Sequence, residues 1–285
     1  MDKVLKTLIY DNQLSLSVLE TTDMVNKAIK LHNLTPVCAA ALGRALTIST
    51  FISSGLKNDR DNLYVTVAGD GPGGKITVCG NRKLEMRASI DNVVDLPLKS
   101  NGKLDVGGLV GRNGRLTIVK NMGLKEPYSG SSKLISGELG EDFAAYFTYS
   151  EQQPTAIAVG VKIGKNLKCV GAGAVIIQAL PYADEKNLIK AEELIGGLTN
   201  VSTLIEEMGA EKLMQSITDG EYYEYLPKYK CNCSKRKVDN MLFALGEAEI
   251  NDILEKEGTI KVNCQFCNKE YVYDKFAANK LFNKK

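Results

Sequence analysis

Four of the seven cysteines lie in two short stretches near the C-terminus, YKCNCS and VNCQFCNKEY. The first stretch holds Cys231 and Cys233, and the second, after thirty intervening residues, holds Cys264 and Cys267. Four thiolates brought together make a tetrahedral site that suits zinc and leaves no position open for catalysis. The spacing alone is compatible with a structural zinc site, a dithiol redox site or a reversible switch, and zinc binding is the prediction we favour.

Three features of the C-terminal stretch favour a switch over an inert zinc site. A disulfide across the single residue of C-x-C closes a small, strained ring that is easily reduced again. The first pair is flanked by basic residues, which favour the thiolate form: Lys228, Lys230, Lys235, Arg236 and Lys237. A unit of about sixty residues with little apolar content is marginally stable, so metal binding is expected to be coupled to its folding.

Apolar spacing predicts two short amphipathic helices between the pairs, over 238–245 and 250–254, with Gly258 ending the second. Cys264 and Cys267 fall in a turn between two strand-like stretches, without the βαβ context of a thioredoxin-like motif. The aromatic residues around this turn are Phe266, Tyr271, Tyr273 and Phe276. Interleaved with basic residues, they raise the alternative of a zinc-knuckle nucleic-acid-binding protein, but we expect them to fill the core of the unit. The second alternative is a thiol oxidoreductase.

Composition is that of an ordinary globular protein: 285 residues, 44% hydrophobic and 25% charged, with a net charge of +2. There is therefore no overall basic field that would attract nucleic acid or anionic lipid. The N-terminal sequence MDKVLKTLIYDNQ does not resemble a signal peptide, and no apolar stretch is long and uninterrupted enough to predict a membrane span. We expect a cytoplasmic protein, in which paired cysteines bind metal or undergo redox chemistry more often than they form structural disulfides.

The pattern along the chain predicts an α+β fold. Helical spacing covers 23–34, and Thr35-Pro36 starts a second, nearly all-apolar helix that ends near Gly55. Period-two patterns then predict strands in LYVTVAG, KITVCG, KLEMRASI, GRLTIVKN, FAAYFTYS, AIAVGVKI and KCVGAGAVIIQAL, and Asn113-Gly114 predicts a hairpin turn. The segments 184–195 and 198–217 are again helical in pattern.

Charge divides the chain. Residues 183–224 hold ten acidic residues and three lysines, whereas residues 225–285 hold twelve basic and eight acidic residues. We therefore expect a large N-terminal mixed α/β domain over 1–182 with antiparallel-rich sheets, an acidic helical linker over 183–226 and a small zinc-binding domain over 227–285. The acidic linker and the basic domain are expected to dock partly by complementary charge. Unfolding of the zinc domain would then make the apolar faces of the linker helices available.

No enzyme site stands out. GDGPGGK at 69–75 resembles a phosphate-binding loop, but Ile76 and a strand-like continuation follow it, so a hairpin connection is the better interpretation. GAGAV at 171–175 is interpreted as a buried strand, and the single histidine, His32, as a partly buried helix residue. Paired carboxylates such as Glu192-Glu193 fit solvated helix faces.

The whole chain resembles the redox-regulated thirty-three-kilodalton heat-shock chaperones, cytoplasmic holdases of bacteria. The motifs that carry the resemblance are GDGPGG, GRLTIVKN, EPYSG, SGELGEDFAAYF, SEQQPTAIAVGV, IIQALP and the two cysteine stretches. Ala172 and Tyr182 stand where glycine is expected, and Cys38, Cys79 and Cys169 match no switch position.

The resemblance implies an ATP-independent chaperone and not an enzyme. It implies one Zn²⁺ per chain on Cys231, Cys233, Cys264 and Cys267 in the reduced, inactive state. Oxidation would join Cys231 to Cys233 and Cys264 to Cys267, release the zinc and disorder the zinc domain together with the linker. The active protein would bind unfolding client proteins under oxidative and heat stress, commonly as a homodimer; nucleic acid and membrane are not expected partners.

Overall fold

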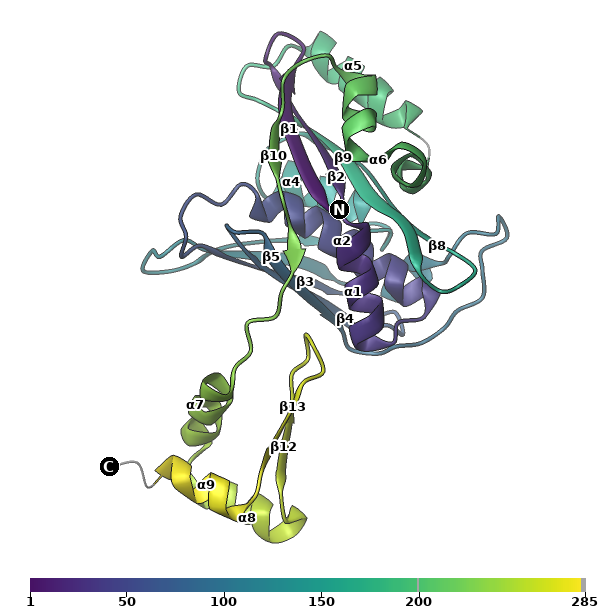
Figure 1. The fold of residues 1–285 in the computed structure, drawn as a ribbon. Coiled ribbons are helices and arrows are strands. Elements are labelled where there is room, and N and C mark those ends of the chain that lie inside the picture. Colours follow the sequence, from purple (N-terminus) through teal and green to yellow (C-terminus); the bar gives the residue numbers. More distant parts are fainter. Residues whose placement is uncertain (199, 283–285) are drawn as a thin grey trace. The chain divides into compact units, whose positions relative to one another are not determined.

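The computed structural model describes residues 1–198 and 200–282 and forms two compact units, Met1–Lys230 and Cys231–Lys285. Each unit has a hydrophobic core of its own. The first unit contains two β-sheets and six helices among its described residues, and the second contains a hairpin and three helices (Figure 1). The α+β class predicted from the sequence is confirmed.

The first sheet has five strands, which are β1 Lys3–Ile9, β2 Leu14–Glu20, β8 Thr155–Ile163, β9 Cys169–Ala179 and β10 Tyr223–Tyr225. Their order is β10-β1-β2-β9-β8, and every neighbouring pair is antiparallel. The second sheet has six strands, which are β3 Asn62–Ala68, β4 Lys75–Asn81, β5 Glu85–Ile90, β6 Arg115–Asn121, β7 Tyr128–Lys133 and β11 Lys228–Tyr229. Its order is β11-β5-β4-β3-β6-β7, and only the β11–β5 pair is parallel.

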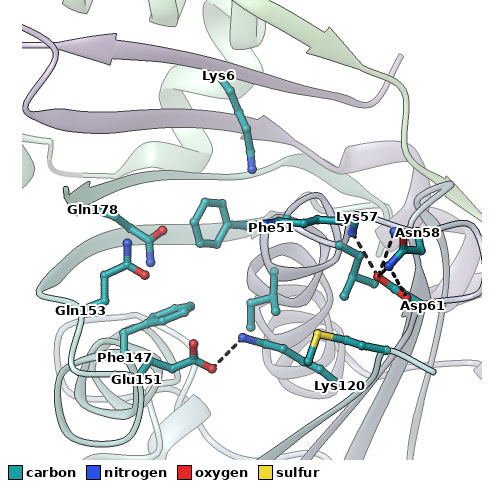
Figure 2. Close-up of a pocket in the computed structure, with 14 residues that line it drawn as sticks. Lys6, Phe51, Lys57, Asn58, Asp61, Lys120, Phe147, Glu151, Gln153 and Gln178 are labelled. Carbon is teal, nitrogen blue, oxygen red and sulfur yellow. Dashed lines mark hydrogen bonds and ion pairs between the residues drawn. The ribbon is translucent and has the colours of Figure 1, made fainter. Parts of the chain in front are cut away.

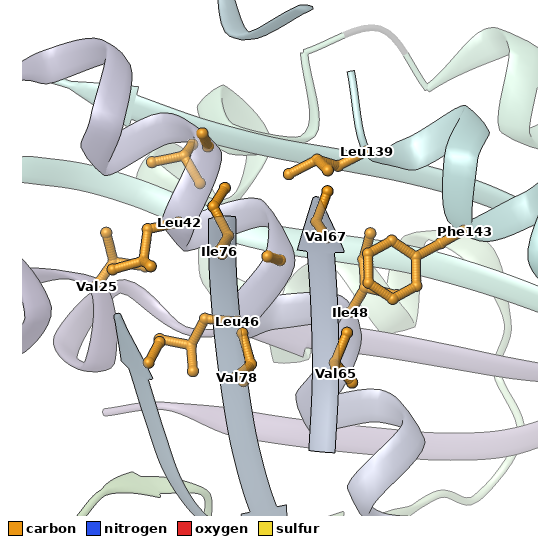
Figure 3. Packing of buried hydrophobic residues seen from close by; sticks show 14 of the residues in the cluster. Val25, Leu42, Leu46, Ile48, Val65, Val67, Ile76, Val78, Leu139 and Phe143 are labelled. Atoms are coloured by element: carbon orange, nitrogen blue, oxygen red, sulfur yellow. The ribbon is translucent and has the colours of Figure 1, made fainter. Parts of the chain in front are cut away.

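Helix α2, Pro36–Ser53, forms the centre of the first unit. It begins at the proline that Thr35-Pro36 predicts and packs against β8 and β9 of the first sheet and against β4 and β5 of the second. Buried aliphatic and aromatic side chains from this helix and both sheets make one continuous cluster. Figure 3 shows the part of it between Leu42 and Leu46 of α2 and the strands β3 and β4 of the second sheet. The helix is long and apolar enough to cross a membrane, but 89% of that window is buried in the protein. Its composition is therefore that of a core helix.

Helices α5, Glu185–Gly197, and α6, Val201–Ile217, cover the other face of the first sheet (Figure 1). Strand residues alternate between the two faces, so Val4 joins the central cluster and Leu5 packs against the helices. The apolar faces of the linker helices thus pack against the first sheet in this structure, and their release on unfolding of the zinc domain stays a prediction. Lys3 pairs with Glu211, and Lys162 pairs with Glu206 at 2.6 Å.

The remaining helices of this unit are α1 Thr22–His32, α3 Val106–Val110 and α4 Gly140–Tyr149. Helix α4 contradicts the predicted strand over FAAYFTYS. Phe143, Tyr146 and Phe147 are all buried and have the i, i+3, i+4 spacing of one helix face. The buried carboxylate of Asp142 accepts four backbone N–H groups just before the helix, which fixes its start.

The predicted hairpin at Asn113-Gly114 is wrong, since the pair lies between α3 and β6. Asn113 instead donates to Asp70 from its backbone N at 3.1 Å and from its side-chain amide at 2.7 Å. Gly69–Gly74, in contrast, does connect the antiparallel strands β3 and β4. GAGAV lies within β9, and His32 is half-buried at the end of α1 with Nε2 3.3 Å from the Tyr229 hydroxyl, as expected of structural residues.

The second unit consists of the helices α7 Lys235–Leu245, α8 Glu247–Glu257 and α9 Lys275–Phe282 and the antiparallel hairpin of β12 Ile260–Asn263 and β13 Glu270–Tyr273. The two helices predicted between the cysteine pairs are confirmed, and Gly258 ends α8 in the left-handed conformation with φ 74°. The core of this unit comprises nine buried residues among those described, from Val238 to Leu281. It is therefore a small core for fifty-two described residues.

Candidate metal centre

Two different local structures present the four cysteines. Cys231 and Cys233 lie on an extended segment that leads into α7, whose first turn is capped by the Ser234 hydroxyl as an acceptor for the Lys237 N–H. Cys264 and Cys267 lie in the turn between β12 and β13. The Cys264 carbonyl accepts from the N–H of Cys267 at 3.2 Å and of Asn268 at 2.8 Å, which closes a tight turn. This turn directs both thiols to the same side.

The structure brings the four sulfurs together. All four Sγ atoms lie within 4.8 Å of one another, with Cys231 Sγ 3.6 Å from Cys264 Sγ and Cys233 Sγ 3.5 Å from Cys267 Sγ. Zinc–sulfur bonds of about 2.3 Å in a tetrahedron put sulfurs about 3.8 Å apart. All four are free thiols and are half-buried. The donor set and its spacing therefore fit a four-coordinate thiolate metal such as Zn²⁺.

Burial and mutual hydrogen bonding separate the pKa values of the thiols. Burial raises the pKa of Cys231, and it also raises that of Cys267. Burial acts in the same direction on Cys233, but hydrogen bonds from the Tyr271 hydroxyl and from the other thiols outweigh it and lower the pKa of Cys233 to about 7. The cluster therefore already stabilises negative charge on one sulfur, which is what a metal ligand requires.

Tyr271 is a residue of this site that the sequence did not reveal. Its side chain is buried, and its hydroxyl donates to Cys233 Sγ at 3.2 Å, so it orients a ligand from outside the sulfur cluster. The neighbouring Tyr273 is also buried but donates to Asp239 at 2.7 Å. Both therefore fill the core of the unit, as expected, whereas Phe276 is 69% exposed, contrary to expectation.

Several basic residues near the first cysteine pair are engaged elsewhere. Lys228 and Lys230 both pair with Glu85 of β5, at 3.5 and 2.7 Å. Lys235 pairs with Asp239 and lies over the Tyr273 ring, while Lys237 Nζ donates to the Asn232 carbonyl. Their effect on the thiols is thus weaker than their number in the sequence implies.

The other three cysteines lie apart from the cluster. Cys38, Cys79 and Cys169 are buried in the first unit, and Cys38 Sγ donates to the Val94 carbonyl at 3.2 Å. Burial raises the pKa of Cys79, and it raises that of Cys169 to about 12, so both stay protonated at neutral pH. The structure thus agrees with their interpretation as core residues.

Comparison with known proteins gives the same result over nearly the whole chain. The family model described as Hsp33 protein matches residues 2–274. A 33 kDa chaperonin of Clostridium tetani is 38% identical, covering 96% of this chain and 95% of its own, and one of Caldanaerobacter subterraneus is 39% identical, covering 95% and 94%. The solved structure of the 33 kDa chaperonin of Thermotoga maritima is similar with a TM-score of 0.90 at 29% identity, covering 98% of this chain and 97% of that one.

Four thiolates around one metal ion would leave no coordination position open for catalysis, which is consistent with a chaperone. The chain belongs to the Hsp33 family of 33 kDa chaperonins, which are chaperones and not enzymes.

Proposed function

We propose that this protein is a redox-regulated, ATP-independent holdase of the cytoplasm, held inactive by one Zn²⁺ on Cys231, Cys233, Cys264 and Cys267. The observation that carries the proposal is the convergence of these four sulfurs within 4.8 Å. Bound there, zinc supplies a cross-link between the segment before α7 and the β12–β13 turn. The clients are unfolding proteins, which active chains bind as homodimers.

The size of the core supports a coupling between metal and fold. Its nine buried residues include Tyr271 and Tyr273, on the strand that follows the second cysteine pair. A unit of this size gains a large part of its stability from a metal or disulfide cross-link. Loss of the metal would therefore disorder the C-terminal unit. We further propose a client-binding domain over 1–182, a linker over 183–226 and a switch domain over 227–285, a division based on the charge pattern of the chain.

Oxidation would act through neighbouring cysteines, as in the family. Cys231 would form one S–S bond with Cys233, and Cys264 would form another with Cys267. For each bond, two thiolates give up two electrons to one molecule of hydrogen peroxide, whose O–O bond breaks and takes two protons from solvent to give two molecules of water. No thiolate then remains to hold zinc. Because all four sulfurs lie within 4.8 Å, the geometry permits this pairing and the two others.

Zinc content and client protection measured on the same sample test the proposal. Reduced protein should hold one zinc per chain and leave a heat-denatured client enzyme to aggregate, as followed by light scattering. After peroxide treatment at elevated temperature, zinc should be released, aggregation should be suppressed without ATP, and peptide mapping should find the two neighbouring disulfides.

A matched pair of variants makes the test specific. Cys267→Ser should lose zinc and the redox control, whereas Cys79→Ser, the same change at a buried cysteine outside the cluster, should keep both. Zinc that stays bound after oxidation, or zinc loss without client protection, would contradict the proposed switch.

A further inference from the structure

A cavity of about 350 Å³ lies inside the first unit, near the C-terminal ends of α2 and α4. Figure 2 shows its lining, with Lys6 and Gln178 from the first sheet on one side and Lys120 from the second sheet opposite. This volume is at the lower end of the range for small-molecule sites in proteins. The cavity is separate from the cysteine cluster, which belongs to the other unit.

Lys6 is an unusual residue for its place in the fold. In β1 it shares a face with Val4, which is fully buried in the central core, so its side chain points inward from a core-facing position. Its Nζ lies 4.9 Å from the centroid of the Phe51 ring (Figure 2). Among the residues that the structure describes, no carboxylate pairs with it. The half-buried ammonium is therefore partly desolvated and is compensated mainly by an aromatic face.

The two carboxylates that line the cavity are already occupied. Glu151 accepts from Lys120 Nζ at 2.7 Å and from the Tyr146 hydroxyl at 2.8 Å. Asp61 accepts the backbone N–H groups of Lys57 at 3.2 Å and Asn58 at 2.9 Å. With three lysines and two acids in its lining, the cavity carries an excess of positive charge, centred on Lys6.

The rest of the lining suits a flat apolar body. Phe51 and Phe147 meet edge to face with their ring centroids 6.1 Å apart, and Ile52, Leu56 and Met122 add aliphatic surface. Gln178 uses its amide N–H on the Thr155 hydroxyl at 3.0 Å. A half-buried cation without a carboxylate partner among the described residues, apolar walls and a few amides form the pattern of a site for an amphipathic ligand.

We propose that this cavity binds a small organic anion, with a carboxylate head on the Lys6 ammonium and an aromatic or short aliphatic body against Phe51 and Phe147. The ion pair replaces the water that burial removes from Lys6, while the body excludes water from the ring faces. This inference does not depend on the redox switch, because all its residues belong to the first unit.

Phenylacetate and its neutral analogue phenylacetamide are suitable probes, titrated against the reduced full-length protein by NMR and calorimetry. We expect saturable binding of phenylacetate at one site and binding of phenylacetamide at least tenfold weaker. Lys6→Met should weaken phenylacetate binding at least tenfold, and Lys6→Arg should restore part of it. Lys3→Met is the matched control on the same strand, since Lys3 pairs with Glu211 and Glu224 outside the cavity.

Labelling of the wild-type chain gives a result that needs no variant. Burial lowers the pKa of Lys6 to about 8, so its amine is neutral and nucleophilic at mildly alkaline pH. With benzaldehyde, whose ring takes the place of the ligand's body, the neutral amine forms an imine and releases water; cyanoborohydride then supplies the hydride, and water the proton, that convert the imine to a secondary amine. Peptide mapping should find Lys6 labelled ahead of exposed lysines and protected by phenylacetate.

Equal binding of phenylacetate and phenylacetamide, no effect of Lys6→Met, or no preferential and protectable labelling of Lys6 would each overturn the proposal.

Discussion

The hydrogen bond from Tyr271 to Cys233 Sγ gives the sharpest test of how the cysteine site is built. Tyr271→Phe removes one oxygen and keeps the ring that packs in the core of the second unit. Cys233 then loses its only hydroxyl donor among the described residues. We expect the fold to persist and zinc to bind more weakly.

The size of the effect follows from the nature of this hydrogen bond. A hydrogen bond to a charged acceptor contributes about 1.5–3 kcal/mol, and the loss of an outer ligand-orienting group lowers metal affinity by about 10–100-fold. Both figures give the same expectation, because about 1.4 kcal/mol corresponds to a tenfold change in affinity. The reduced variant should therefore release zinc at a chelator concentration well below that needed for the wild type.

Competition with a chromophoric zinc chelator, under reducing conditions at neutral pH, measures this directly. Tyr273→Phe is the matched control, since it removes a hydroxyl from the same strand that is also buried but bonds to Asp239 instead of a sulfur. Zinc affinity lowered to the same extent in both variants would show a general loss of stability, and unchanged affinity in Tyr271→Phe would refute the role of the hydroxyl.

Three further outcomes are expected. Chelation of zinc from the reduced protein should lower the helical circular dichroism signal by roughly the contribution of α7, α8 and α9 and leave amide protection in the central strands β2, β3, β4 and β9 of the first unit intact; unchanged helicity would refute the coupling. Burial lowers the pKa of Lys6 to about 8, so the unfolded state binds more protons than the folded state between pH 8 and 10.5. Lys6 therefore lowers the free energy of unfolding below pH 8, and this cost fades as the pH rises. Lys6→Met should therefore raise the free energy of unfolding in urea by on the order of 3 kcal/mol at pH 7 and by much less at pH 10, and an equal gain at both pH values would refute this. Tyr229→Phe removes a hydroxyl that donates to the Ala88 carbonyl at 2.9 Å and accepts from the Ala88 N–H at 3.2 Å. Hydrogen exchange at Lys228–Lys230 should therefore accelerate by about 5–100-fold. Unchanged exchange would show that this hydroxyl does not hold the segment.

Sequence patterns predicted the elements whose signals agree at several levels. Helix α2 has Thr35 at its N-cap position and a proline in its first turn, which indicate where it starts, and its nearly all-apolar sequence indicates that it is buried, although the Thr35 hydroxyl makes no capping hydrogen bond. The stretch over Gly69–Gly74 was assigned correctly because a strand-like pattern resumes directly after it. These signals are local, so no knowledge of the rest of the fold was needed.

The wrong assignments involve segments whose structure depends on distant partners. The spacing of the aromatic residues of α4 is compatible with a strand and with a helix. The helix forms because the Asp142 carboxylate accepts hydrogen bonds from the backbone N–H groups that precede it. Strands β10 and β11 have three and two residues, too few for a periodic signal, and they exist because they pair with edge strands. The packing of α5 and α6 on the first sheet had a usable signal, since β9 is apolar on both faces and so indicates a sheet that is buried on both sides.

The part of the candidate site that residue type and sequence spacing define could be predicted. The four cysteines identify themselves by type, whereas Tyr271 becomes a partner of Cys233 only through the register of β12 and β13. Lys6 had only a weak signal in the sequence, since it shares the phase of Val4, but KVLKTLI does not alternate strictly and Leu8, in the same phase, is 45% exposed.

The two units differ in what stabilises them, and this difference determines how a change at the cysteines acts. The first unit has two extended apolar clusters, whereas the described residues of the second include nine buried core residues and a site that fits a metal. A change at the sulfurs should therefore reach the first unit through the segment that joins α6 to Cys231. That segment is attached by three residue pairs of β10 with β1, two of β11 with β5, and the Tyr229 side chain. Such short attachments open at low free-energy cost, so they are the first contacts that disorder spreading from the cysteine unit would break, exposing the edges of β1 and β5.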